Sequence, residues 1–204
     1  MAREEGISNI VLFPLIKDAK GAAPSWGEPI NVPWAQNFET EDEYREGIYY
    51  GDNIVEQSRK VISKVNVDME VSSDVPPKLD AEITGKGYTG GMAHKSIGQN
   101  SPAYAVAYEI LMSDGNLRRR VIYNTGFTRD SQTNKTIEEE GEGQTYTYTG
   151  VGLPLSSTGD VEGTMDLKEI QAISDEKEKT WTMARWDKFF TEPVLPEKYT
   201  EIIE

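Results

Sequence analysis

Histidine, the side chain best suited to proton transfer near neutral pH, occurs once in this chain, at His94. No carboxylate or nucleophile is linked to it by sequence, so a surface or interface position is favoured over a catalytic base. Cysteine is absent, which excludes disulfides and thiol catalysis and leaves a zinc site only His94 and carboxylates. The 35 acidic residues offer many carboxylates for glycoside hydrolysis, but no spacing singles out a pair. We therefore expect no catalytic residue, no metal site, no cofactor and no enzyme activity.

Two short segments have the spacing of ligand sites without the required context. The glycines within residues 85–90 match a dinucleotide-binding loop, which works only when a strand precedes it and a helix follows. Here a short helix is expected before the glycines. Residues 130–141 weakly resemble a calcium loop, but Lys and Gly stand where that loop needs Gly and a bidentate Glu. We interpret the second segment as part of a solvated hairpin loop.

The one basic cluster is Arg118, Arg119 and Arg120, in a chain of net charge −14. On a strand, Arg118 and Arg120 share one face and Arg119 takes the other. Interleaved aromatic residues are missing, so pairing with acids of the same or a neighbouring subunit is favoured over nucleic-acid binding. The acidic balance argues against wrapping nucleic acid, although an acidic wall would let DNA pass without sticking. Simple solubility explains the charge equally well.

The elements that would position these residues are mostly strands. Strict alternation from Val61 to Val71 predicts a long strand with one buried and one wet face. Pro76 or Pro77 then begins a short helix, which Leu79 and Ile83 must dock on the body and which Gly85 ends. Alternating runs over 104–112 and 117–125, joined through Asp-Gly, predict a β-hairpin. Further strands are expected at 7–16, 30–38, 144–151 and 161–170.

Other segments are interpreted as irregular. Residues 39–47 hold five acids and one Arg, which favours a solvated, mobile loop, and 128–143 is a second polar loop. Residues 174–179 are expected to be a charged linker. The four aromatic residues beyond it are too costly to leave exposed, so they dock on the body or anchor a neighbouring molecule. Without a signal peptide or an apolar run long enough to span a bilayer, the chain is expected to stay soluble in a cytoplasm.

In this order, the elements resemble the major tail protein family of long, non-contractile-tailed bacteriophages, whose members are tail tube proteins. The resemblance covers roughly residues 7–167. It is carried by the long strand and short helix together with these segments: Phe13-Pro14-Leu15, Tyr49-Tyr50-Gly51-Asp52-Asn53, the run from Pro102 to Glu109, the Asp114-Gly115 hairpin with its arginines, Tyr123, Phe127 and the acid-then-Thr stretch 136–149. The aromatic-then-Pro ending also looks family-like.

The resemblance implies a mainly β fold, a β-sandwich or barrel-like tail tube domain with one short packed α-helix, a long loop and extended terminal arms. The domain would span 1–170, followed by a charged linker and aromatic arm over 171–204. Subunits would form hexameric rings that stack into a tube for DNA ejection, in a virion assembled in the host cytoplasm. The implied partners are further copies of the chain, a tape measure protein in the lumen, and tail terminator and distal tail proteins at the ends. DNA would pass without specific binding, and no membrane partner is expected.

Under this interpretation three groups of residues have structural roles. The ring and stacking interface is expected to include Glu39, Glu41, Asp42, Glu43, Tyr44, Tyr50, Asp52, Asn53, Arg118 and Arg120. Leu79 and Ile83 dock the helix, and Trp181, Trp186, Phe189 and Phe190 anchor the C-terminal arm. The alternative is a monomeric β-sandwich module that binds carbohydrate or a receptor, with exposed Trp181 and Trp186 stacking on sugars. Self-assembly separates the two, because a binding module stays monomeric.

Overall fold

The computed structural model describes residues 2–51, 54–72, 74–129 and 145–200, and the chain is mainly β. The strands are β1 (Glu4–Lys17), β2 (Ser25–Trp26), β3 (Ile30–Asn31), β4 (Ala35–Gly51), β5 (Ile54–Ser72), β6 (Gly87–Thr89), β7 (Met92–His94), β8 (Ala103–Met112), β9 (Leu117–Thr128), β10 (Thr145–Gly152) and β11 (Glu162–Asp166). The helices are α1 (Pro77–Thr84), α2 (Leu167–Gln171) and α3 (Glu176–Lys188).

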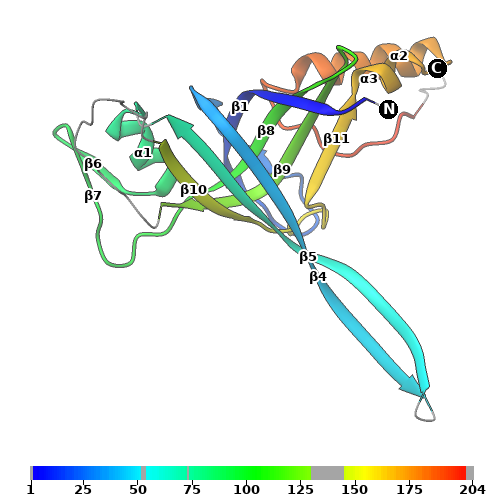
Figure 1. Ribbon diagram of the computed structural model, residues 1–204, viewed down its shortest axis with the longest axis horizontal. Coiled ribbons are helices and arrows are strands. Elements are labelled where there is room, and N and C mark those ends of the chain that lie inside the picture. The colour runs from blue at the N-terminus through cyan, green and yellow to red at the C-terminus, as the bar shows by residue number, and fades with distance from the viewer. Residues whose placement is uncertain (1, 52–53, 73, 130–144, 201–204) are drawn as a thin grey trace.

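Nine of these strands form one antiparallel sheet in the order β2-β1-β8-β9-β10-β5-β4, with β11 paired to β9 and β3 paired to β1. The predicted hairpin is β8–β9, which turns at Ser113–Asn116, with Gly115 at a φ of 78°. The predicted long strand is β5, which pairs with β4 on one side and with β10 on the other. β6 and β7 form a separate two-stranded hairpin beside α1 (Figure 1).

The sheet curls so that its two halves pack face to face, which produces a sandwich-like main core. Val65, Val67 and Met69 of β5 face this core with no exposed surface, and β1 and β8 supply its opposite wall. Phe38 of β4 stacks on Tyr108 of β8, with ring centroids 4.4 Å apart. This contact joins one edge of the sheet to its middle and holds the curl.

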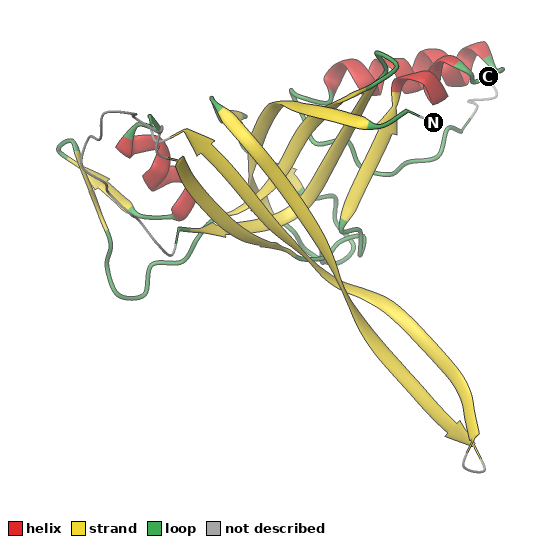
Figure 2. Cartoon of the chain, in the orientation of Figure 1, coloured by secondary structure: helices red, strands yellow, loops and turns green. Residues whose placement is uncertain are grey.

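A second core lies on the other face of β1, β8 and β9, beneath α3 and the segment that follows it. Phe13, Ala105 and Ala107 form its floor, and Phe189 at the end of α3 covers them with only 1% of its surface exposed. β8 is therefore buried on both faces, which explains why alanine alternates with large side chains along it. Figure 2 shows α2 and α3 on this side, away from α1.

The predicted short helix is confirmed as α1, which begins at Pro77 and ends at Gly85 in the left-handed conformation. Leu79 and Ile83 both pack against the main core, and Ile83 is fully buried. The expectation of one helix is wrong, since the described residues form three. Residues 171–204 are not an extended arm over their described part either, because α3 runs through the expected linker. Asp175 caps that helix by accepting hydrogen bonds from the backbone N–H groups of Lys177 and Glu178, at 2.8 and 3.0 Å.

The expectation of a mobile acidic loop at 39–47 is also wrong, because these residues belong to β4. Acids are disfavoured in buried strands, but every residue from Glu39 to Gly47 has a partner in β5. Here Glu43 lies opposite Lys64 and Glu46 opposite Lys60, so cross-strand charge pairs replace burial. The last predicted strand ends early at Asp166, whose carboxylate caps α2 instead.

Candidate assembly surfaces

The most conspicuous surface is a two-stranded arm that projects from the body (Figure 1). β10 covers the edge of β5 only from Val65 to Ser72, so residues 43–51 and 54–64 form a two-stranded arm with no third strand among the described residues. At about 3.4 Å per residue, each strand of the arm reaches roughly 30 Å beyond the sheet. Both edges of the arm present backbone N–H and C=O groups that a single copy leaves unpaired by strand neighbours.

The arm is wet on both faces. Tyr44 and Val61 expose 51% and 52% of their surface. The register shift between Glu43 and Tyr44 interrupts the alternation of β5, so that Ile62, and not Val61, lies on the same face as Val65 and packs at the edge of the main core. Its ion pairs are exposed, with Lys60 Nζ 2.7 Å from Glu46 and Lys64 Nζ 2.9 Å from Glu43. The hydrogen bond from Lys64 lowers the pKa of the Glu43 carboxyl, and the hydrogen bond to Glu46 raises the pKa of Lys60. These contacts help to fix the pairing register of β4 and β5 in the arm, where apolar burial is small.

Most predicted interface residues lie on β4, at the edge of the sheet and on the arm. Glu39, Glu41, Asp42, Glu43 and Tyr44 are all exposed. The Tyr44 hydroxyl donates to Asp42 at 3.0 Å, and this bond raises the pKa of Tyr44. The backbone of Tyr50 also belongs to β4, whereas Asp52 and Asn53 fall outside the described residues.

Arg118 and Arg120, also predicted at the interface, lie on β9 and are paired inside the chain. Arg118 contacts Asp166 at 3.1 Å, and both arginines contact Glu4, at 3.3 and 3.2 Å. Burial opposes ionisation of Asp166, but hydrogen bonds from Asn116, the Glu169 backbone and Arg118 outweigh it and lower its pKa. The cluster therefore joins the first strand to the end of β11, and pairing with acids of the same subunit is confirmed.

The middle arginine of the cluster connects the sheet to α3, a role that the sequence analysis missed. Arg119 Nε lies 2.9 Å from Glu109, and its Nη1 donates to the Trp186 carbonyl at 2.5 Å. The guanidinium also stacks on the rings of Trp186 and Phe190, 4.0 and 4.7 Å from their centroids. The alternation in β9 signals that Arg119 points away from its neighbours, but only the tertiary structure shows what it meets.

The aromatic anchors pack within their own chain. Trp186 and Phe189 are 5% and 1% exposed, and Phe190 packs on the second core. Trp181 is partly buried, with Arg185 stacked on its ring at 4.4 Å. The expectation that Trp186 is exposed is therefore wrong, and the sugar-stacking pair required by a carbohydrate-binding module is not formed.

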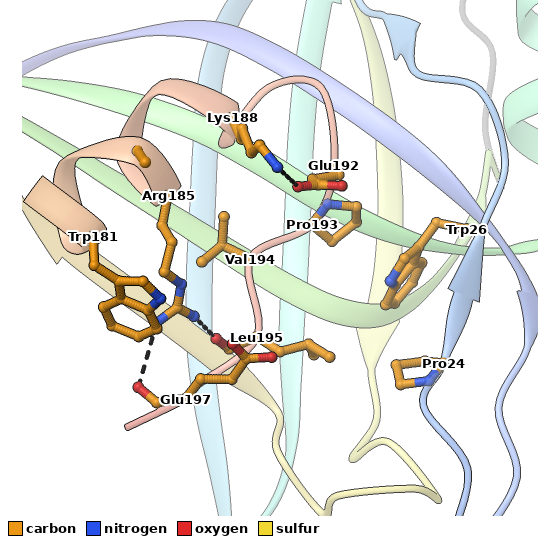
Figure 3. A pocket seen from close by; sticks show the side chains of 11 residues that line it. Pro24, Trp26, Trp181, Arg185, Lys188, Glu192, Pro193, Val194, Leu195 and Glu197 are labelled. Carbon is orange, nitrogen blue, oxygen red and sulfur yellow. Dashed lines mark hydrogen bonds and ion pairs between the residues drawn. The ribbon is translucent and has the colours of Figure 1, made fainter. Parts of the chain in front are cut away.

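A pocket of about 450 Å³ lies between α3, the segment after it and β2 (Figure 3). Arg185 donates from Nη1 to the Glu197 carbonyl at 3.3 Å and from Nη2 to the Leu195 carbonyl. Lys188 pairs with Glu192 at 3.2 Å. Because these charged groups form hydrogen bonds and an ion pair within the chain, we interpret the pocket as part of the surface on which the C-terminal segment packs.

A buried ionic cluster fixes α1, and the sequence analysis missed it as well. Asp80, with 8% of its side chain exposed, contacts Lys86 at 2.6 Å and Arg129 at 3.0 Å. The Tyr148 hydroxyl donates to the same carboxylate at 3.0 Å. Arg129 also stacks on Tyr146, with its guanidinium 4.4 Å from the ring centroid. Asp80 lies three residues before Ile83, which is the only signal in the sequence that it faces inward.

Other candidate chemistry is sparse over the described part of the chain. Within those residues no group of three or more His, Cys, Asp or Glu side chains is placed to hold a metal. His94 is exposed at the end of β7, opposite Gly87 of β6. The calcium-like segment at 130–141 lies outside the described residues. None of the described helices has the length and apolar character needed to cross a membrane.

Comparison with known proteins gives no match in sequence and distant likeness among solved structures. No protein-family model matches the chain, and no curated protein matches it. Among solved structures, a chain in the 6-fold symmetrised cryo-EM structure of the anti-feeding prophage baseplate is similar, with a TM-score of 0.37 and 10% identity. The aligned region covers 77% of this chain and 91% of that chain.

Proposed function

We propose that this chain is a structural, non-catalytic subunit of a phage tail tube, which self-assembles into stacked hexameric rings. The arm is the observation that carries the proposal. A two-stranded ribbon that is wet on both faces is marginally stable by itself, and its open edges are templates for pairing with another chain. A monomeric binding module has no use for such an element, whereas contact with further copies would stabilise it.

The resemblance in element order supports the same assignment, and the asymmetry of the molecule favours a ring. The arm projects from one side of a body that has no second arm over its described residues, so contacts between copies would be head-to-tail (Figure 1). Head-to-tail contacts generate closed rings when the rotation between copies closes. In the assembled tube the chain would contact further copies of itself.

The remaining partners are those that the resemblance implies. A tape measure protein would occupy the lumen, and tail terminator and distal tail proteins would cap the ends of the tube. DNA would pass without specific binding, which the net charge of −14 favours. The protein would be assembled in the host cytoplasm and reside in the virion.

Negative-stain electron microscopy of the purified, concentrated protein tests the assignment. We expect hollow tubes or six-fold rings from the full chain. The matched variant has residues 47–59 replaced by Asn-Gly, which joins Glu46 to Lys60, directly opposite each other, through a two-residue turn. It should retain the thermal melting temperature of the body, because Ile62, which packs on the main core, and the other described residues of both cores are kept, yet stay monomeric.

A full chain that is uniformly monomeric at high concentration would contradict the assignment and make a glycan-binding screen the next measurement. Tubes formed equally well by the shortened variant would contradict the role of the arm while leaving the tube itself standing.

A further inference from the structure

The two faces of the arm differ in charge. Arg45 pairs with Val61 and Gly47 with Arg59, so the two arginines lie diagonally on one face. Both are exposed, and neither forms an ion pair with a described residue. The opposite face carries the internally neutralised pair of Lys60 and Glu46. This face of the arm therefore carries two arginines without an ion-pair partner among the described residues, next to the neutral pair of Glu43 and Lys64.

The outer face of the sheet, at the base of the arm, carries negative charge instead. Glu39 of β4 lies directly opposite Asp68 of β5, and like charges in that position destabilise a strand pair. The neighbouring registers place Glu41 and Glu70 on the same face. Among the described residues no cation pairs with any of these four carboxylates. Glu70 accepts only a hydroxyl hydrogen bond, from Thr145 at 2.5 Å.

The two surfaces cannot neutralise each other within one copy. Even Glu41, the nearest of the four carboxylates along β4, lies four residues before Arg45, which separates them by about 14 Å of extended chain. The hairpin also twists where it leaves the sheet, so that its two strands cross in the view of Figure 1. The two arginines therefore stay exposed on the arm, beyond the acidic residues of their own copy.

We propose that the Arg45–Arg59 face of the arm docks on the acidic sheet face of the next copy, formed by Glu39, Glu41, Asp68 and Glu70. The inference rests on the proposed self-assembly and names the surfaces that meet. Subunits that each carry a net charge of −14 repel one another, so local charge complementarity sets the register in which they approach. Two arginines on an acidic chain suit a carboxylate surface better than a phosphate backbone, which needs many cations.

A charge-swap experiment tests this docking, with the assembly threshold of nuclease-treated protein measured by light scattering and sedimentation. R45E/R59E should raise the threshold concentration at least about tenfold, because two attractive contacts become repulsive. E39K/D68K should raise it comparably. Combining the four substitutions should restore assembly to within about threefold of wild type, since the complementarity is regained with its sign reversed.

Two controls separate docking from other effects. K17E/K20E changes the net charge by the same amount at exposed sites on and after β1, and should leave the threshold within about twofold. The swap E46K/K60E preserves the ion pair on the opposite face of the arm and should also leave it unchanged. Circular dichroism and thermal melting of each variant confirm that the body remains folded.

The outcomes distinguish the two proposals. Wild-type protein that never assembles overturns the tube and the docking together. If wild type assembles and R45E/R59E has the same assembly threshold, the docking proposal is overturned and the tube proposal stands. The same holds if the variant with all four substitutions does not regain assembly. Assembly that disappears on nuclease treatment would assign the arginines to nucleic acid instead. An equal effect of K17E/K20E would reduce the result to net charge.

Discussion

The two halves of β5 have the same alternating pattern but opposite environments. From Val65 to Val71 the apolar residues have no exposed surface, because β10 extends the sheet on one side and β1 and β8 cover the face. Six residues earlier than Val67, Val61 is 52% exposed on a ribbon of two strands. The comparison shows that alternation in the sequence specifies a strand but not its burial. The register shift between Glu43 and Tyr44 turns Val61 to the outer face, and beyond Val65 the pair β4–β5 has no third strand among the described residues.

The difference also separates two ways of stabilising a β-hairpin. The body half is held by apolar burial and buried ion pairs, whereas the arm is held by its hydrogen-bond ladder and by exposed cross-strand charge pairs. Exposed pairs contribute about 0–1 kcal/mol each, and an isolated hairpin is marginal in water. Body and arm should therefore respond very differently to the same kind of substitution.

The largest contrast is expected between ion pairs in the two regions. Asp80→Asn removes the negative charge that Lys86 and Arg129 both contact, in a site where all three side chains are at most 11% exposed. We expect a loss of about 3–5 kcal/mol in the free energy of unfolding. Glu46→Gln breaks the exposed pair with Lys60 and should cost about 0–1 kcal/mol. Urea denaturation of monomeric protein measures both, and equal losses would contradict the contrast.

Apolar side chains of β5 give the next contrast. Met69→Ala removes a fully buried side chain from the main core and should cost about 2–5 kcal/mol, including the cavity left behind. Val61→Ala, on the same strand, should change the free energy of unfolding by less than about 0.5 kcal/mol. The same denaturation series checks this pair. A comparable loss at Val61 would show that the arm packs on something in the monomer.

Much of the body could be predicted from sequence because local signals agree there with the tertiary structure. The Asp-Gly turn, the alternation on both sides of it and the glycine that ends α1 each specify one local conformation. These predictions are confirmed because they concern elements that are specified by residues close together in the sequence.

The failures have one physical cause, which is that charge was interpreted without knowledge of the partner. Five acids within residues 39–47 favoured a loop, yet β5 supplies the lysines that make a strand tolerable. The charged segment before Trp181 favoured a linker, yet Asp175 caps a helix there and Phe189 buries it. For the candidate surfaces, the acids of β4 were identified, but Arg45 and Arg59 were not. Their shared face depends on the hairpin register, which composition does not reveal.

Alkaline pH should act on the body through its buried tyrosines. Burial raises the pKa of Tyr104 from 10.0 to about 12 and also raises the pKa values of Tyr108, Tyr123 and Tyr148. A raised pKa means that the folded state keeps its proton after the unfolded state has lost it. The stability contributed by Tyr104 is therefore complete below pH 10 and falls by up to about 3 kcal/mol as the pH rises to about 12.

Denaturation at several pH values checks this dependence. Tyr104→Phe should lower stability at neutral pH, because the hydroxyl donates to the Glu82 carbonyl at 2.6 Å, yet lose less of it between pH 10 and 12. Tyr44→Phe is the comparison on the arm, where the hydroxyl is exposed to water and solvent screens its interaction with Asp42, so the pH slope should change much less than in Tyr104→Phe. An unchanged slope in Tyr104→Phe would contradict the assignment.

The smallest expected loss of stability concerns the end of β10, where the body ends and the arm begins. Gly152 is the last residue of β10 and pairs with Val65, and a Cβ added there would lie 2.7 Å from Ile122 Cγ2. Ile122 is fully buried and cannot retreat, so Gly152→Ala should cost about 1–2 kcal/mol through overpacking. Gly6→Ala, which meets nothing within 4 Å, should be neutral within about 0.5 kcal/mol.

If hydrogen exchange in Gly152→Ala accelerated at Val65 while the arm amides kept their rates, the junction would be set by this packing. Equal acceleration along the whole hairpin would instead show that body and arm open as one unit.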